Sequence, residues 1–250
     1  MPPVLQIRFG TANLDDLVES WTESYDRRIS QFLIPRLDGG AKIDVGLFGA
    51  RRIRVRGQMF DTSLSALRTS FDALLKILND GKKNLTLYDD RQIECQRDRL
   101  SYNYLRGTPL SVVQFNIDFI AEAAFWEKTT AESQIVEVVS SSPHTFNIVN
   151  SGTAFSRPKV TIVADQGGSV ANFTFENTTT EDKWSFTGTV ANTKSLVVDH
   201  DAGTVLNDGV DAIADFNGAL VGFRIKEGTS AMKYTGDVCT IKVDYTQRFA

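Results

Sequence analysis

The sequence contains few residues of the kinds that activate nucleophiles or bind transition metals. His144 and His200 are its only histidines, and Cys95 and Cys239, far apart in the chain, are its only cysteines. A nucleophile–histidine–acid triad or a zinc site needs more of these side chains. We therefore predict no catalytic residues, no metal ligands and no cofactor, and we expect the two cysteines to be buried free thiols.

The segment Asp199-His200-Asp201 is the one place where potential metal ligands are adjacent in sequence. Neighbouring residues on an extended strand point to opposite faces, so these three side chains cannot converge on one ion. A strand that ends in a turn at Ala202-Gly203 explains the segment better. The chain also has no glycine-rich phosphate-binding loop. The sequence does not indicate an enzyme.

Two other groups of residues could bind partners. Arg52, Arg54 and Arg56 alternate with Ile53 and Val55, which predicts a strand with the arginines on its outer face. Guanidinium groups there could bind the carboxylates of another protein, or the arginines could form an ordinary solvated face. Trp184 and Phe186 could stack on a saccharide, the alternative being that both pack in the core.

The composition is that of an ordinary globular protein with one large domain or two of usual size. The 250 residues are 42% hydrophobic and 23% charged, with a formal net charge of −4. This charge provides no global attraction to nucleic acid or to an anionic membrane. The N-terminus lacks the pattern of a signal peptide, and no apolar run approaches the ~20 residues that span a bilayer. We expect synthesis in the cytoplasm and no membrane insertion.

The strongest predicted element is a helix over 62–79. Thr62 or Ser63 can cap its first turn, and Gly81 lies just beyond its end. Its apolar residues recur at spacings of three and four and form one stripe: Leu64, Leu67, Phe71, Leu74, Leu75 and Leu78. Strand patterns flank it at 51–60 and 85–88. A helix with one apolar face between strands is expected to lie on a sheet.

Further strands are predicted at 4–9, 28–34, 100–104 and 113–119, whereas 13–21 fits a helical period too briefly to assign. Mixed strands with one helix indicate an α+β domain over 1–132. The rest of the chain, 133–250, shows short alternating segments at 159–164, 171–176, 184–190, 195–199, 204–206, 221–226 and 238–245. Such a series predicts an all-β sandwich, whose last strand could return to the first domain. The fold class is mainly β.

Four stretches of the chain are similar to one known family, the distal tail proteins of long-tailed bacteriophages of the siphovirus type. They are the following segments: Ile34-Pro35 with Asp38-Gly39 before the strand at 52–57, the helix at 62–79, Ala123-Ala124-Phe125-Trp126-Glu127, and Gly152–Pro158 leading into a domain with Leu196-Val197-Val198-Asp199 and Asn207-Asp208-Gly209. An alanine stands at Ala124, where the family usually has proline.

The resemblance implies an N-terminal sheet or split barrel with one packed helix and a peripheral, galectin-like C-terminal β-sandwich. It implies a structural virion protein that forms a ring, usually of six copies, at the distal end of the tail tube. Its partners would be the tail tube protein, the end of the tape measure and the tail-tip or baseplate proteins, and DNA would pass through without specific binding. The alternative is a carbohydrate-binding adhesion protein in which the β-sandwich binds a host saccharide.

Overall fold

The computed structural model describes residues 7–15, 17–33, 40–87, 90–106, 110–130 and 134–250, with 25–33, 40–49 and 106 described by their backbone alone. The chain divides into two compact units, Met1–Thr129 and Thr130–Ala250. Each unit is described here by itself.

The first unit is built on one antiparallel sheet whose strands follow the order β2-β1-β5-β6-β7-β4-β3, with β8 pairing with β6. Its strands are β1 (Ile7–Phe9), β2 (Ala12–Asn13), β3 (Val18–Leu33), β4 (Gly40–Asp61), β5 (Lys83–Leu87), β6 (Arg91–Arg106), β7 (Ser111–Ala121) and β8 (Trp126–Lys128). The strands predicted at 51–60, 100–104 and 113–119 are confirmed as parts of β4, β6 and β7. The strand predicted at 85–88 is confirmed over 85–87 as part of β5, and residue 88 lies outside the described residues.

Helix α1 spans Leu64–Leu78, which confirms the helix predicted over 62–79. Ser63 is the N-cap, because its side chain accepts a hydrogen bond from the amide of Ala66 at 3.1 Å. Asn79 is the C-cap, and Gly81 follows with φ of 78°, a conformation that glycine adopts without a steric penalty.

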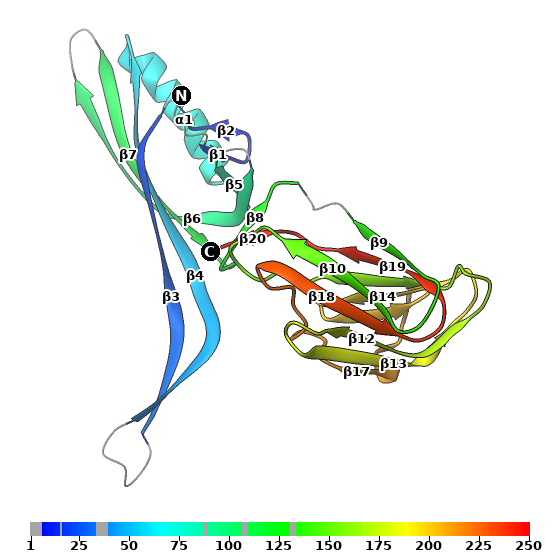
Figure 1. Ribbon diagram of the computed structural model, residues 1–250. Coiled ribbons are helices and arrows are strands. Elements are labelled where there is room, and N and C mark those ends of the chain that lie inside the picture. Colours follow the sequence, from blue (N-terminus) through cyan, green and yellow to red (C-terminus); the bar gives the residue numbers. More distant parts are fainter. Residues whose placement is uncertain (1–6, 16, 34–39, 88–89, 107–109, 131–133) are drawn as a thin grey trace. The chain divides into compact units, whose positions relative to one another are not determined.

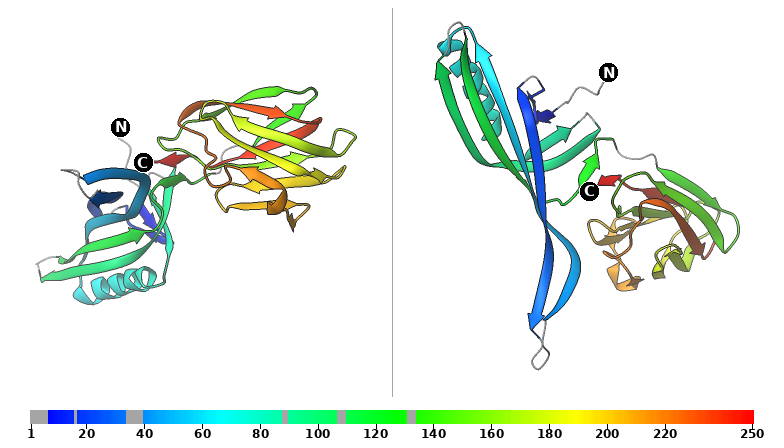
Figure 2. Two further views of the ribbon diagram at one scale, coloured as in Figure 1. Left: turned by 90° about the horizontal axis from the view of Figure 1, so that it is seen from below. Right: turned by 60° about the vertical axis from the view of Figure 1, so that its left-hand side comes forward.

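One face of the sheet is covered by α1 (Figure 1; Figure 2, left). The helix buries Leu67, Phe71, Leu74 and Leu78. Phe71 is the centre of this contact, with its ring centroid 4.9 Å from that of Tyr102 and 6.3 Å from that of Phe115. The leucine stripe thus meets the apolar face of β6 and β7. Among the residues of this unit that the structure describes, no helix covers the opposite face of these strands.

Strands β3 and β4 form a long antiparallel pair, visible in blue in Figures 1 and 2. In its described residues, the segment 13–21, whose periodicity is too brief to assign, belongs to β2, a connection and the start of β3. Its apolar residues recur at helical spacing, but pairing with β4 prevails: Val18 lies opposite Gly57 and Trp21 opposite Val55. Tertiary pairing therefore overrides a short local period.

The second unit is a pair of antiparallel sheets. Their strand orders are β10-β18-β12-β13-β17 and β16-β15-β14-β11-β19-β9. The strands of the two sheets are β9 (Ile135–Val139), β10 (His144–Asn150), β11 (Lys159–Val163), β12 (Val170–Asn177), β13 (Asp182–Val190), β14 (Ser195–Asp199), β15 (Thr204–Asn207), β16 (Val210–Asp211), β17 (Phe216–Gly218), β18 (Gly228–Thr235) and β19 (Cys239–Asp244). The short strand β20 (Arg248–Phe249) lies outside these two sheets, and a 3-10 turn η1 spans Ile213–Asp215. The predicted all-β sandwich is confirmed.

The core of the sandwich lies between its two sheets and is rich in aromatic rings. Phe173, Phe175, Trp184, Phe186, Phe223 and Tyr234 are all fully buried there. The strand predicted at 221–226 is wrong: Phe223 and Ile225 alternate inward as on a strand, but Ile225 forms only a single bridge, with Ser156. Strands β10 and β18, by contrast, were not predicted.

The described fold is mainly β with one α-helix, as the sequence predicted. Within the ranges that the structure describes, no helix is long and apolar enough to cross a membrane.

Candidate functional site

The arginines of β4 lie on the face of the sheet that α1 does not cover, hereafter the bare face. Ile53 and Val55 are buried on the helix side, and Arg52, Arg54 and Arg56 are exposed on the other. This is the arrangement that the alternation predicted. The ion pairs that each arginine forms within the sheet determine how much of its charge is available to a partner.

Two of the three arginines are paired with carboxylates of neighbouring strands. Arg54 donates from Nε and Nη2 to the two carboxylate oxygens of Asp118 on β7, at 2.6 and 3.0 Å. This hydrogen-bonded contact lowers the pKa of Asp118 below its usual value. Arg52 donates from Nη1 to Asp98 on β6 at 2.9 Å. Both pairs are partly solvated, so solvent screening leaves each of them little net contribution to stability.

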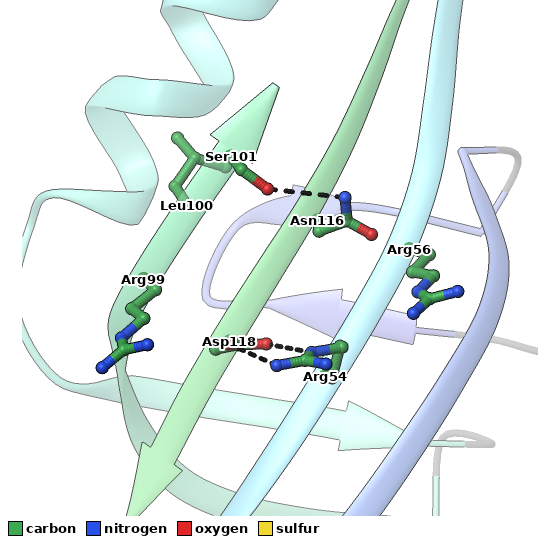
Figure 3. Close-up of a pocket in the computed structure, with 7 residues that line it drawn as sticks. All are labelled: Arg54, Arg56, Arg99, Leu100, Ser101, Asn116 and Asp118. Atoms are coloured by element: carbon green, nitrogen blue, oxygen red, sulfur yellow. Dashed lines mark hydrogen bonds and ion pairs between the residues drawn. The ribbon is translucent and has the colours of Figure 1, made fainter. Parts of the chain in front are cut away.

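Arg56 and Arg99 complete the charged part of the bare face. Among the residues that the structure describes, neither has a carboxylate within ion-pair distance. They border a shallow hollow whose full lining is Arg54, Arg56, Arg99, Leu100, Ser101, Asn116 and Asp118 (Figure 3). Arg99 was not predicted, because nothing local in the sequence shows that β6 places it in the same cross-strand row as Arg54 and Asp118.

Arg51, next to this group in sequence, has a different role. Its side chain is 1% exposed, and its Nη1 donates to Oε2 of Glu23 on β3 at 2.8 Å. The indole Nε1 of Trp126 donates to the same oxygen at 2.9 Å. We call these three residues the Glu23 network. It joins β3, β4 and β8, and it fixes structure rather than presenting charge to a partner.

The aromatic residues considered for saccharide stacking are not accessible. Trp184 is 1% exposed and Phe186 is fully buried, and both rings pack against Phe173. A stacked sugar needs an open ring face, which neither side chain offers. The saccharide hypothesis for Trp184 and Phe186 is corrected accordingly: both belong to the core of the second unit.

His200 is also a core residue. Its Nδ1 donates to the carbonyl oxygen of Leu220, and its ring stacks on Phe223 with centroids 4.7 Å apart. Burial lowers its pKa to about 4, so the ring is neutral near pH 7. Asp199 instead accepts hydrogen bonds from the amides of Asp201 and Ala202 in a turn. In the described ranges, no three His, Cys, Asp or Glu side chains are grouped to hold a metal ion.

The thiols of Cys95 and Cys239 are buried and free. Burial raises their pKa values to about 12 and about 11 respectively, so neither is a thiolate near neutral pH. These groups lack the ionisation that nucleophilic catalysis requires. The exposed chemistry of the described residues therefore centres on the bare face of the first unit.

Comparison with known proteins finds a family match in the second half of the chain. Residues 151–249 match the family described as siphovirus-type tail component, C-terminal domain. No curated protein matches the sequence.

One solved structure has a similar fold along nearly the whole chain. The distal tail protein Dit of phage SPP1, described as a paradigm of the hub adsorption apparatus in phages that infect Gram-positive bacteria, aligns over 99% of this chain and 100% of its own, with a TM-score of 0.69 and 16% identity. A chain of the phage P2 baseplate in its calcium-activated conformation covers 96% of this chain and 98% of its own, at a TM-score of 0.41 and 9% identity. The first match shows a common fold, and with the family match it confirms the resemblance drawn from the sequence motifs.

Proposed function

We propose that this chain is a structural protein of a bacteriophage tail. It forms a ring at the distal end of the tail tube, joins the tube to the tail tip or baseplate, and leaves a channel for the genome. The observation that carries the proposal is the agreement of the fold with SPP1 Dit along both chains, together with the family match over residues 151–249.

The sheet of the first unit supports ring formation physically. A ring requires two different surfaces on each copy that fit head to tail. Strand β3 is one edge of the sheet, and in the described residues Arg99–Arg106 of β6 pair only with β7. These two stretches of backbone hydrogen-bonding groups can pair with strands of neighbouring copies. Closure would remove both edges.

In this proposal the ring contains six copies and contacts the tail tube protein, the end of the tape measure and the tail-tip proteins. The protein is located in the virion tail, after synthesis in the host cytoplasm. It acts through binding rather than catalysis, and the DNA passes without a specific site.

In this proposal the side chains of Arg52, Arg54 and Arg56 lie at an inter-subunit or inter-ring contact. Arg54→Glu tests this, since it reverses a charge at the centre of the bare face. The matched control is Arg68→Glu, a charge reversal on the exposed side of α1. Loss of assembly for Arg54→Glu alone supports the placement. Normal assembly of that variant counts against it.

Negative-stain electron microscopy of the purified protein is the direct test of ring formation. Closed rings with a central opening and peripheral lobes would support the proposed function and give the copy number. A protein that stays monomeric alone and also fails to form rings on added tail tubes would contradict it.

A further inference from the structure

Two exposed large apolar residues of the first unit, Phe60 and Leu105, lie in one cross-strand row at one end of the bare-face strands. The other exposed large apolar residues that the structure describes in this unit are Tyr102, whose ring contacts Phe71 of α1, and Leu110, which precedes β7. Phe60 on β4 lies opposite Val112 on β7, which lies opposite Leu105 on β6. We call Phe60, Val112 and Leu105 the apolar row. Phe60 is 53% exposed, and a cluster of this kind marks a protein contact more often than an isolated exposed residue does.

Successive cross-strand rows lead from the apolar row to the arginines. Next comes an amide row of Gln58, Gln114 and Asn103. Two residues further along each strand lie Arg56, Asn116 and Ser101, and after them Arg54, Asp118 and Arg99. Because a strand rises ~3.4 Å per residue, the Cα atom of Arg56 is about 14 Å from that of Phe60, and the Arg99 row is about 20 Å away.

The free positive charge of this surface is confined to two side chains. Arg54 is neutralised by its two hydrogen bonds to Asp118 (Figure 3). Arg56 and Arg99 lie on either side of Asn116 and Asp118, without ion pairs among the described residues. A guanidinium presents a planar fork of donors that fits a carboxylate. Two such groups beside an amide and a hydroxyl can bind one or two discrete carboxylates.

A protein fits this surface better than a nucleic acid does. A phosphate backbone presents closely spaced negative charges, and Asp98 and Asp118 lie on the path that it would follow across the arginines. The amide row offers no charge to a phosphate. The backbone of a duplex presents no apolar group that could pack on the apolar row, whereas an apolar side chain of a protein could.

We propose that the bare face is a docking surface for another protein of the tail, one that presents an apolar side chain to the apolar row and carboxylates to Arg56 and Arg99, about 14 to 20 Å away. The proposal rests on the function proposed above, since a hub must bind other tail components, and of the two contacts named there it adopts the inter-ring one. It adds the chemistry by which one of them is recognised.

A synthetic peptide tests this chemistry without the natural partner. The probe is a fluorescein-labelled peptide of threonines that contains one leucine and two glutamates. The glutamates follow the leucine by four and six residues, so that at a rise of ~3.4 Å per residue they reach Arg56 and Arg99 when the leucine lies on the apolar row. A second probe carries glutamines in place of the glutamates. Binding is measured by fluorescence anisotropy at about 50 mM NaCl, where charge contacts are weakly screened.

The test variant is Arg56→Gln with Arg99→Gln, and the control is Arg68→Gln with Lys76→Gln, which removes the same charge from exposed positions of α1. We expect the test variant and the glutamine probe each to weaken binding at least about tenfold, because charge-assisted hydrogen bonds are lost. Phe60→Ser should also weaken binding, and Val210→Ser, at an exposed residue of the second unit, should not. Circular dichroism confirms that each variant is folded.

Equal losses in the test and control variants would overturn the proposal, because they would indicate non-specific attraction. So would the absence of wild-type binding up to about 1 mM peptide. Tighter binding of a DNA duplex, lost in the test variant, would assign the surface to nucleic acid instead. Self-association lost in that variant would assign it to a second copy. Electron microscopy of the same samples scores rings separately, so failure of peptide binding with intact rings refutes only this inference.

Discussion

The contact between α1 and the sheet can be tested by truncating its central ring with Phe71→Ala. The Phe71 side chain is fully buried. An aromatic side chain buries ~200 Å², and truncation to alanine removes roughly 150 Å² of it. At ~25 cal/mol per Å² this corresponds to about 4 kcal/mol, within the ~3–5 kcal/mol typical of Phe→Ala in a core.

The assay is urea unfolding followed by ellipticity at 222 nm. This signal reports chiefly on the first unit, because α1 is the α-helix of the described residues and lies there. With a urea dependence of ~2 kcal/mol per M, a loss of about 4 kcal/mol lowers the midpoint by roughly 2 M.

Phe60→Ala is the matched control, because it makes the same chemical change at a residue that is about half exposed. Its expected cost is below about 1 kcal/mol. If Phe71→Ala lowered the midpoint no more than Phe60→Ala does, the reasoning that α1 is held by its apolar stripe would be refuted.

Three further predictions concern single groups. Ser63→Ala should destabilise the first unit by about 1 kcal/mol through loss of the helix cap, while Ser63→Asp keeps the cap; equal midpoints in urea for all three proteins would contradict this. For His200, the folded pKa of about 4 lies below the ~6.5 of an unfolded histidine, so the unfolded state binds the proton first and stability should fall by up to roughly 3 kcal/mol from pH 6.5 to pH 4. His200→Gln should flatten this part of the pH profile, and an unchanged slope would rule the histidine out as its cause. Cys95 and Cys239 should react with a thiol reagent only after unfolding, and rapid labelling of the native protein would show that they are accessible.

Local patterns in the sequence are sufficient to predict an element when its apolar residues all face one core. The stripe of leucines in α1 and the alternation of Val113, Phe115, Ile117 and Phe119 each specify an element without its partners. The sequence does not predict strand β18, because its inward residues include Ser230, which the alternation counts as polar. The alternation of apolar residues over 221–226 predicts a strand, but in the described structure this segment forms only the single bridge between Ile225 and Ser156.

The site was only partly predictable for a related reason. The outward direction of Arg52, Arg54 and Arg56 follows from a period of two. Their pairing does not, since Arg54 and Asp118 are separated by 64 residues and Arg52 and Asp98 by 46. Similarly, Arg51 reads as one more surface arginine until Glu23 is placed beside it. Cross-strand register decides which charges remain free, and register is a property of the folded sheet.

The Glu23 network also constrains when the first unit can fold during synthesis. Its oxygen acceptor on β3 and the indole donor of Trp126 are 103 residues apart, so the network closes nearly the full length of this unit. Until Trp126 has emerged from the ribosome, Glu23 of the nascent chain can pair with Arg51 but cannot accept the hydrogen bond from the indole of Trp126. Completion of the first unit must then coincide with the emergence of the second, whose strands follow directly.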